Sequence, residues 1–165
     1  MKILALEFST DCRTVAVLDT GASSAANHPI AQIEATYGRS TRTCAMIESA
    51  LRQAGLEREA IDTLAVGLGP GSYAGIRAAI AFASGWQLAR PARLVGLSSV
   101  ECLVAQLHTQ GETGPILAAV DAQRGDFYLA GYELAPAGWC EVEPLRLVSA
   151  GDLDRRLRAG ARVVS

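Results

Sequence analysis

The chain has 165 residues, half of them apolar, which is enough for one ordinary domain or two small lobes with a buried core. Its formal net charge is −2 and its pI is near 5.7, so no broad basic surface favours direct binding to RNA or DNA. The apolar stretch at 78–82 is short and lies between Arg77 and Gln87, which excludes a membrane-spanning helix there.

The N-terminus and the cysteines favour a cytoplasmic protein. Residues 1–4 lead directly into a strand pattern, so we expect no signal peptide. Four cysteines, Cys12, Cys44, Cys102 and Cys140, are widely spaced and form no C-x-x-C pair. We therefore expect reduced, mostly buried thiols.

The first part of the chain predicts strands, followed by alternating helices and strands. Apolar runs between polar turns predict strands, and apolar residues at helical spacing predict helices. The expected strands are 2–8, 14–18, 30–36, 63–66 and 93–97. The first expected helix is capped by Ser40 or Thr41 and ended by Gly55, with Cys44, Ile47 and Leu51 on its apolar side. A helical turn is expected at 57–61. Two further helices are expected, one at 76–89 stopped by Pro91 and one capped by Ser98 or Ser99 that runs to about His108.

A glycine-rich turn, residues 67–77 with the sequence GLGPGSYAGIR, connects one strand directly to the next helix. The chain's only lysine is Lys2, which excludes a Walker-type loop, and Ser72 stands where a dinucleotide fingerprint needs glycine. Two interpretations stay open. Either the amides around Gly69, Gly71 and Ser72 hold an anion such as phosphate, or the glycines simply permit a tight turn and close helix packing.

The same pattern begins again after the polar segment 110–115. The expected elements are strands at 116–121, 127–134 and 141–148, a helix at 152–158 and a last strand at 162–164. In both copies an apolar strand ends in a carboxylate, Glu7 or Asp121, and a short polar turn follows. This repeat predicts two related lobes of mixed sheet flanked by helices, 1–109 and 110–165, with the second lobe incomplete.

The two strand-end acids are the first candidate site. In a duplicated fold Glu7 and Asp121 can face each other across a cleft, where paired carboxylates usually hold a metal or a metal–phosphate. The alternative is that both are solvated acids in turns.

The helix after the glycine turn is the second candidate site, because small and apolar residues line more than one of its faces. One face can pack on the lobe's own sheet. The other is then an association surface, unless the helix is fully buried within the monomer. The candidate interface residues are Tyr73, Ile76, Ala79, Ile80, Ala83 and Trp86.

Three stretches resemble the TsaB (YeaZ) family: residues 3–10 (ILALEFST), residues 67–77 and residues 119–128 (AVDAQRGDFY). The resemblance covers essentially the whole chain. It implies an actin-like ATPase (ribonuclease H-like) fold in a bacterial protein needed to make threonylcarbamoyladenosine in tRNA. The family usually has aspartate where Glu7 stands, and its members continue well beyond residue 164.

This resemblance implies a non-catalytic scaffold or activator subunit. Such a subunit would pair with the catalytic subunit TsaD, cooperate with the ATPase TsaE, form a homodimer in isolation and reach tRNA only through the complex. The alternative is a nucleotide-binding actin-like ATPase or switch. It would hold ATP or ADP with magnesium through Glu7, Gly69, Gly71, Ser72 and Asp121, or through the partner complex.

The chain offers little catalytic machinery of its own. His28 and His108 stand alone in the sequence, and Ser72 is not part of a G-x-S-x-G motif. We therefore expect no catalytic residue and no dedicated metal site.

Overall fold

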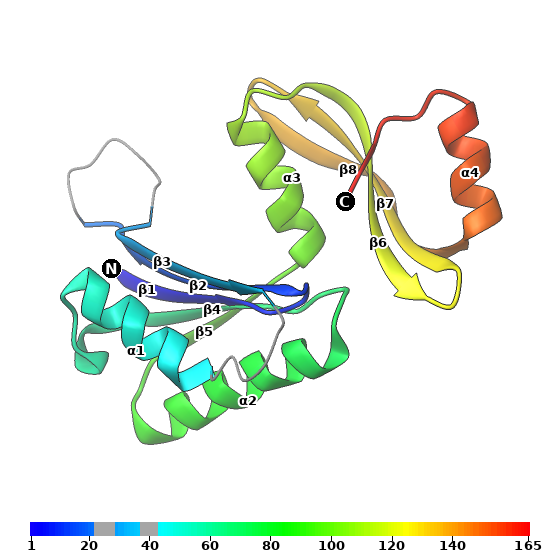
Figure 1. The fold of residues 1–165 in the computed structure, drawn as a ribbon. Helices are drawn as coiled ribbons and strands as arrows, with labels where there is room; N and C mark the ends of the chain where they lie inside the picture. The colour runs from blue at the N-terminus through cyan, green and yellow to red at the C-terminus, as the bar shows by residue number, and fades with distance from the viewer. Residues whose placement is uncertain (22–28, 37–42) are drawn as a thin grey trace. The chain divides into compact units, whose positions relative to one another are not determined.

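The computed structural model describes residues 1–21, 29–36 and 43–165 (Figure 1). These residues form two compact units, Met1–Leu97 and Ser98–Ser165. The cap predicted at Ser40 or Thr41 and the residue His28 lie outside the described residues. No helix in the described parts of the chain is long and apolar enough to cross a membrane.

Unit 1 is a mixed sheet with helices on it. Its elements are β1 (Lys2–Glu7), β2 (Cys12–Asp19), β3 (Ala31–Thr36), α1 (Thr43–Ala54), the 3-10 turn η1 (Arg58–Ala60), β4 (Thr63–Gly67), α2 (Tyr73–Ala89) and β5 (Arg93–Leu97). Among the described residues of this unit the strand order is β3-β2-β1-β4-β5. β1 pairs antiparallel with β2 and parallel with β4, and β4 pairs parallel with β5. Each of these strands and helices was predicted from the sequence.

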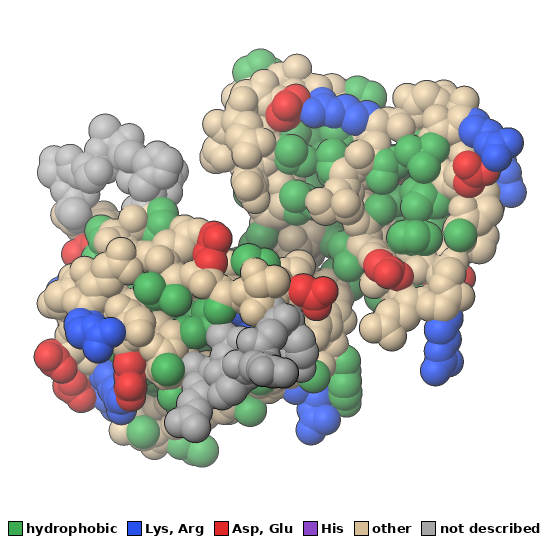
Figure 2. All heavy atoms as spheres, viewed as in Figure 1, with side chains coloured by type: hydrophobic (Ala, Val, Ile, Leu, Met, Phe, Trp, Pro, Cys, Tyr) green, Lys and Arg blue, Asp and Glu red, His purple; other side chains and the backbone are tan. Residues whose placement is uncertain are grey.

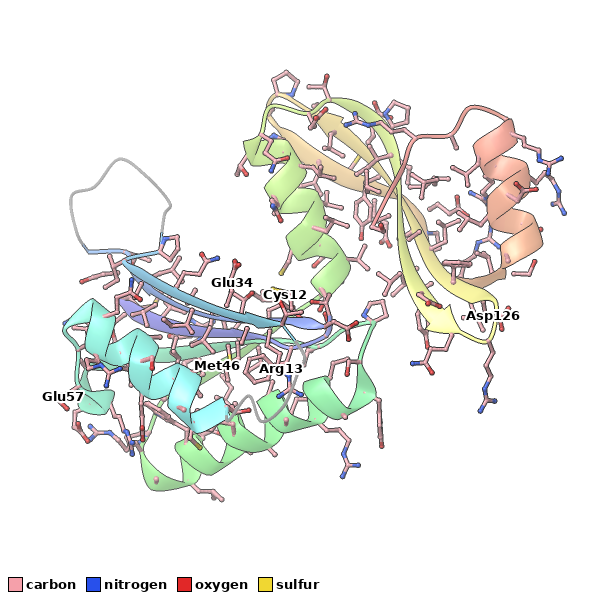
Figure 3. All side chains as sticks on the ribbon, in the orientation of Figure 1. Cys12, Arg13, Glu34, Met46, Glu57 and Asp126 are labelled. Atoms are coloured by element: carbon pink, nitrogen blue, oxygen red, sulfur yellow. The ribbon has the colours of Figure 1, made fainter. Side chains whose placement is uncertain are left out.

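The core of unit 1 lies between the sheet and the two helices α1 and α2, which cover the same face (Figure 1). Met46 points from α1 into this layer, and the Arg13 guanidinium of β2 lies 5.4 Å from the ring centroid of Phe8 (Figure 3). Helix α1 ends at Gly55, which has a φ of +65°. The amides of Gly55 and Leu56 donate back into the last turn, so the helix closes with a Schellman motif.

Unit 2 has one helix on each face of its sheet (Figure 1). Its elements are α3 (Ser99–Thr109), β6 (Gly114–Gln123), β7 (Asp126–Ala135), β8 (Gly138–Ser149), α4 (Ala150–Arg158) and β9 (Val163–Val164), and the strand order is β8-β7-β6-β9. Val100 and Val104 of α3 pack on one face, and Leu153 of α4 packs on the other. Glu143 of β8 accepts hydrogen bonds from Arg156 of α4, at 2.6 and 2.8 Å, which ties helix to strand.

The predicted repeat is present in the topology. β6 pairs antiparallel with β7 and parallel with β9, as β1 does with β2 and β4. The order strand, strand, strand, helix, strand therefore produces the same pairing in both units. The compact units divide between Leu97 and Ser98, whereas the sequence placed the lobe boundary after residue 109. The difference is α3, because its apolar side packs into the core of unit 2.

The prediction of mostly buried cysteines was wrong. All four cysteines lie in described parts of the chain, and each is exposed and outside any disulfide. The reason is clearest in α1. The sequence placed Cys44 on the same apolar side as Ile47 and Leu51, but the buried side of the helix consists of Met46, Ile47, Ala50 and Leu51.

Candidate functional site

The glycine-rich turn joins the end of β4 to the start of α2 and lies against the segment that follows β1. The backbone N–H of Ser72 donates to the carbonyl oxygen of Ser9 at 2.6 Å. The Ser72 side chain caps α2, because its Oγ accepts from the Gly75 N–H at 3.3 Å. The turn is therefore fixed both to the neighbouring strand and to its own helix.

Two glycines make this close contact possible. A Cβ at Gly71 would overlap the Ser9 carbonyl oxygen, and a Cβ at Gly75 would overlap the Phe8 carbonyl oxygen. Gly71 also has a φ of +147°, which side chains rarely adopt. These contacts agree with the interpretation that the glycines permit a tight turn and close helix packing.

Fewer backbone N–H groups are available to bind an anion here than the sequence suggested. The N–H groups of Ser72, Gly75 and Ile76 each donate within the chain. Gly69 follows β4 in the same turn, with a φ of +83°. That Gly69, Gly71 and Ser72 bind a cofactor stays a prediction.

Of the two acids expected at strand ends, Glu7 is the last residue of β1, whereas Asp121 lies within β6, which continues to Gln123. Glu7 Oε1 accepts the N–H of Ser9 at 2.7 Å, and Asp121 Oδ1 accepts the N–H of Gln123 at 2.7 Å. Each carboxylate thus accepts a hydrogen bond from the backbone amide two residues on. The Glu7 carboxylate also fills the space where a side chain at Gly67 would lie. No group of three or more potential metal ligands occurs among the described residues.

Helix α2 divides the predicted interface residues between its two faces. Ala79 and Ala83 are 0% and 2% exposed and belong to the core of unit 1, so they cannot form a docking surface. Tyr73 and Ile80 are 74% and 41% exposed, and Leu88 is exposed on the same helix. Ile76 and Trp86 are partly buried. Among the predicted interface residues, Tyr73 and Ile80 are thus the exposed ones, and that they form an interface stays a prediction.

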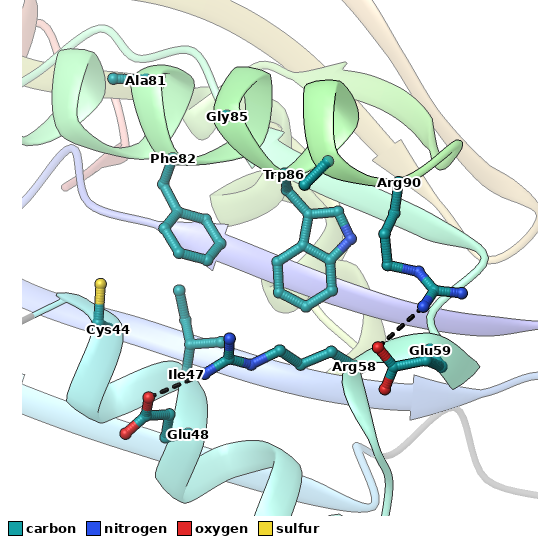
Figure 4. Close-up of a pocket in the computed structure, with 11 residues that line it drawn as sticks. Cys44, Ile47, Glu48, Arg58, Glu59, Ala81, Phe82, Gly85, Trp86 and Arg90 are labelled. Carbon is teal, nitrogen blue, oxygen red and sulfur yellow. Dashed lines mark hydrogen bonds and ion pairs between the residues drawn. The ribbon is translucent and has the colours of Figure 1, made fainter.

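A groove lies between α1 and α2 (Figure 4). Its volume is about 670 Å³, and Ile47, Phe82 and Trp86 form its apolar wall. The rings of Phe82 and Trp86 are tilted against each other with centroids 5.7 Å apart. A Cβ at Gly85 would meet nothing within 4 Å, so the groove wall is open there.

Four charged side chains border the groove, and sequence reasoning missed them. Arg58 donates to Glu48 of α1 at 2.9 Å, and Arg90 at the end of α2 donates to Glu59 at 2.8 Å. The turn η1 thus connects to both helices through two adjacent residues of opposite charge (Figure 4). The adjacent pair Arg58-Glu59 in the short turn between the first helix and the strand at 63–66 was the available signal. On the face of unit 1 seen in Figure 2, acidic and basic side chains lie interspersed.

Comparison with a solved structure defines the class of fold. YeaZ from Pseudomonas aeruginosa matches with a TM-score of 0.76 at 24% identity, over 90% of this chain and 66% of that chain. Together with the duplicated topology, this match defines an actin-like α/β fold of two lobes of mixed sheet flanked by helices.

Comparison of the sequence defines the family. A family model described as "TsaD: tRNA N6-adenosine threonylcarbamoyltransferase" matches residues 34–139. The tRNA threonylcarbamoyladenosine biosynthesis protein TsaB of Escherichia coli is 30% identical over 133 residues, 81% of this chain and 55% of that protein. The TsaB of Haemophilus influenzae is 28% identical over 130 residues, 79% of this chain and 53% of that protein. The chain belongs to the family that this model describes, and both curated relatives are named TsaB. It spans little more than half the length of these curated relatives.

Proposed function

We propose that this chain is a non-catalytic scaffold or activator subunit in bacterial tRNA threonylcarbamoyladenosine modification and that it pairs with a TsaD-type catalytic subunit. The observation that carries the proposal is the outward face of α2. Tyr73 and Ile80 are exposed apolar side chains on a helix of a family whose relatives are named for this pathway. Exposed apolar surface is typical of protein–protein contact.

The same proposal includes the other partners. A TsaE-type ATPase joins the complex, a homodimer forms in isolation, and tRNA is reached only through the assembled subunits. The chain's net charge of −2 supports the last point, because an acidic protein attracts phosphate groups poorly.

A pair of matched substitutions tests the pairing. Ile80 and Ile30 are 41% and 44% exposed, but Ile80 lies on α2 and Ile30 lies just before β3. Ile80→Glu is expected to weaken binding to a TsaD-type subunit by about tenfold or more, because a carboxylate would be buried in the contact. Ile30→Glu is the control and is expected to bind normally. Equal affinity of both variants would place the contact elsewhere.

The activity of the complex tests the second part of the proposal, that the chain acts as a scaffold or activator. Adding this chain to a reconstituted threonylcarbamoylation assay with TsaD- and TsaE-type subunits is expected to raise the yield of modified tRNA. Ile80→Glu is expected to lose this effect and Ile30→Glu to keep it. An assay that runs equally well with and without the chain would contradict the scaffold role.

The second candidate function, a nucleotide-binding switch, is favoured by one observation. Glu7 in the first repeat and Asp121 in the second each accept a hydrogen bond from the backbone amide two residues on. Titration calorimetry with ATP and magnesium tests it. Binding by the wild type that Glu7→Gln abolishes supports a switch, and no heat of binding contradicts it.

A further inference from the structure

The hairpin that joins β6 to β7 turns just before Asp126, which is labelled in Figure 3. Gln123 pairs with Asp126, so the loop consists of Arg124 and Gly125, whose φ angles are +58° and +86°. Positive φ at both loop residues is the pattern of a type I′ turn, which favours asparagine, aspartate or glycine at its first position. Gln123 also has a positive φ, +67°. Two long side chains thus stand on a backbone conformation that residues other than glycine rarely adopt.

Contacts on two sides hold this strained turn in place. Asp121 Oδ1 accepts the N–H of Gln123 at 2.7 Å, and the carbonyl oxygen of Gly125 accepts the N–H of Ala150 at 2.9 Å. The turn is therefore fixed both to β6 and to the first residue of α4. Strained backbone persists only where the surrounding structure enforces it, and it is common at binding sites. The side chain at the tip of this turn is Arg124.

Arg124 differs from every other arginine of unit 2, all of whose residues are described. It is exposed and makes no ion pair or hydrogen bond within the chain. The other arginines of the unit each pair with a carboxylate: Arg146, Arg155, Arg156, Arg158 and Arg162. The hairpin thus presents one uncompensated guanidinium on a rigid tip.

Exposed apolar side chains lie on the sheet behind this tip. Tyr128 of β7 pairs across the strands with Leu147 of β8, and Leu145 lies two residues away along β8. These three side chains, here called the hairpin patch, are 36%, 55% and 41% exposed, respectively. Tyr128 also pairs with Val120 of β6, which packs against the core under α3. The hairpin patch is therefore a continuation of the α3 face of the sheet that the helix leaves uncovered.

We propose that Arg124 and the hairpin patch form a second protein-docking surface, for a partner segment that carries a carboxylate beside apolar side chains. Charge complementarity defines the occupant, because an unpaired guanidinium matches a carboxylate through two parallel hydrogen bonds. The leucines favour a protein segment over a free anion, since apolar surface gains nothing from a hydrated ion. Arginine and tyrosine are also enriched among the residues that dominate binding energy in protein interfaces.

This surface lies on unit 2, whereas the contact proposed for a TsaD-type subunit lies on α2 of unit 1. The inference rests on the proposed function for the identity of the partner, which is a different subunit of the same complex. The probe is therefore the TsaE-type ATPase. Its binding is measured by titration calorimetry, both with and without the TsaD-type subunit, so that a failure of pairing at α2 is seen separately.

Substitutions at the tip separate binding from folding. Asparagine suits a type I′ turn, so Arg124→Asn is expected to unfold at the same temperature as the wild type or higher. It should nevertheless bind the ATPase roughly tenfold more weakly or worse, because the guanidinium is gone. Arg124→Lys keeps the charge without the planar fork, and an intermediate affinity is expected. The difference between Arg124→Asn and the wild type should shrink at high salt.

A matched pair of leucines tests the hairpin patch. Leu147→Glu should also weaken binding by roughly tenfold or more, since it would bury a carboxylate in the contact. Leu157 of α4 is 49% exposed and lies outside the patch, so Leu157→Glu is the control and is expected to bind like the wild type.

Three results would overturn the proposal. The first is an ATPase that binds the wild type, Arg124→Asn and Leu147→Glu equally, and the second is an ATPase that does not bind the wild type at all. The third is a loss of self-association in Arg124→Asn and Leu147→Glu by sedimentation velocity, which would make a second copy the occupant. The pairing test with Ile80→Glu is independent of all three and decides the contact at α2 alone.

Discussion

The carbonyl oxygen of Ser9 accepts a 2.6 Å hydrogen bond from the backbone N–H of Ser72. This one contact joins the segment after β1 to the start of α2, which are 63 positions apart in the chain. It places the helix that carries the candidate interface directly on the strand that ends in Glu7. Local changes in the glycine turn should therefore alter the stability of unit 1 as a whole.

Substituting two glycines of α2 with alanine should have opposite effects. In Gly75→Ala the new Cβ would overlap the Phe8 carbonyl oxygen, and we expect a loss of about 1–3 kcal/mol in the free energy of unfolding. In Gly85→Ala the Cβ meets nothing within 4 Å, and the helix should gain up to about 1 kcal/mol from the better helix former. Urea denaturation followed by circular dichroism compares the two. Equal stability of both variants would mean that α2 does not lie so close to the backbone after β1.

The two faces of α2 should respond differently to the same charge. Ala83→Glu places a carboxylate in the core, where Ala83 is 2% exposed, and is expected to prevent folding or to cost several kcal/mol, roughly 3 or more. Ile80→Glu changes an exposed side chain and should cost less than about 1 kcal/mol. Thermal unfolding of both variants checks this division of the helix. A stable, folded Ala83→Glu protein would contradict it.

All four thiols should react in the native protein, because all four cysteines are exposed. Titration with a disulfide reagent, without denaturant, is expected to modify four thiols per chain. Adding denaturant should change the number of reactive thiols little. Protection of two or more thiols until unfolding would support the burial that the sequence suggested.

Acid should weaken the attachment of α4 to β8. The hydrogen bond from Arg156 is the main cause that lowers the pKa of Glu143 from its ordinary value of 4.5, and Arg146 acts in the same direction while burial opposes both. Because the pKa is lower in the folded state, the stabilisation is complete above the unfolded-state pKa. It is lost as the pH falls below about 4.5 and through the folded-state pKa.

Glu143→Gln measures this contribution. At neutral pH the variant should be less stable by about 1–2 kcal/mol, since a charge-assisted hydrogen bond is lost. The difference from the wild type should shrink as the pH falls below about 4.5. Asp154→Asn is the control, because it removes an exposed i,i+4 pair with Arg158 on the same helix. A Glu143→Gln deficit that does not change with pH would exclude titration of this carboxyl as the cause.

The sequence by itself determined the order of the elements. Alternation in β1, the helical spacing in α1 and the glycine after it are local signals, and they predicted strands and helices near their observed bounds. The repeated pattern of strand, acid and turn predicted the duplication that the two sheets display. The motif stretches identified the family.

Only the tertiary structure decided which face of each element is buried. In α2, small residues occur on several faces, so periodicity could not separate Ala79 and Ala83 in the core from Ile80 at the surface. The ion pairs of η1 join residues 10 and 31 positions apart, and no local sequence pattern predicts pairs so far apart in the chain. Likewise, α3 belongs to unit 2 because its apolar side packs there. Local propensity acts within a few residues, whereas burial and charge pairing depend on what the folded chain brings alongside.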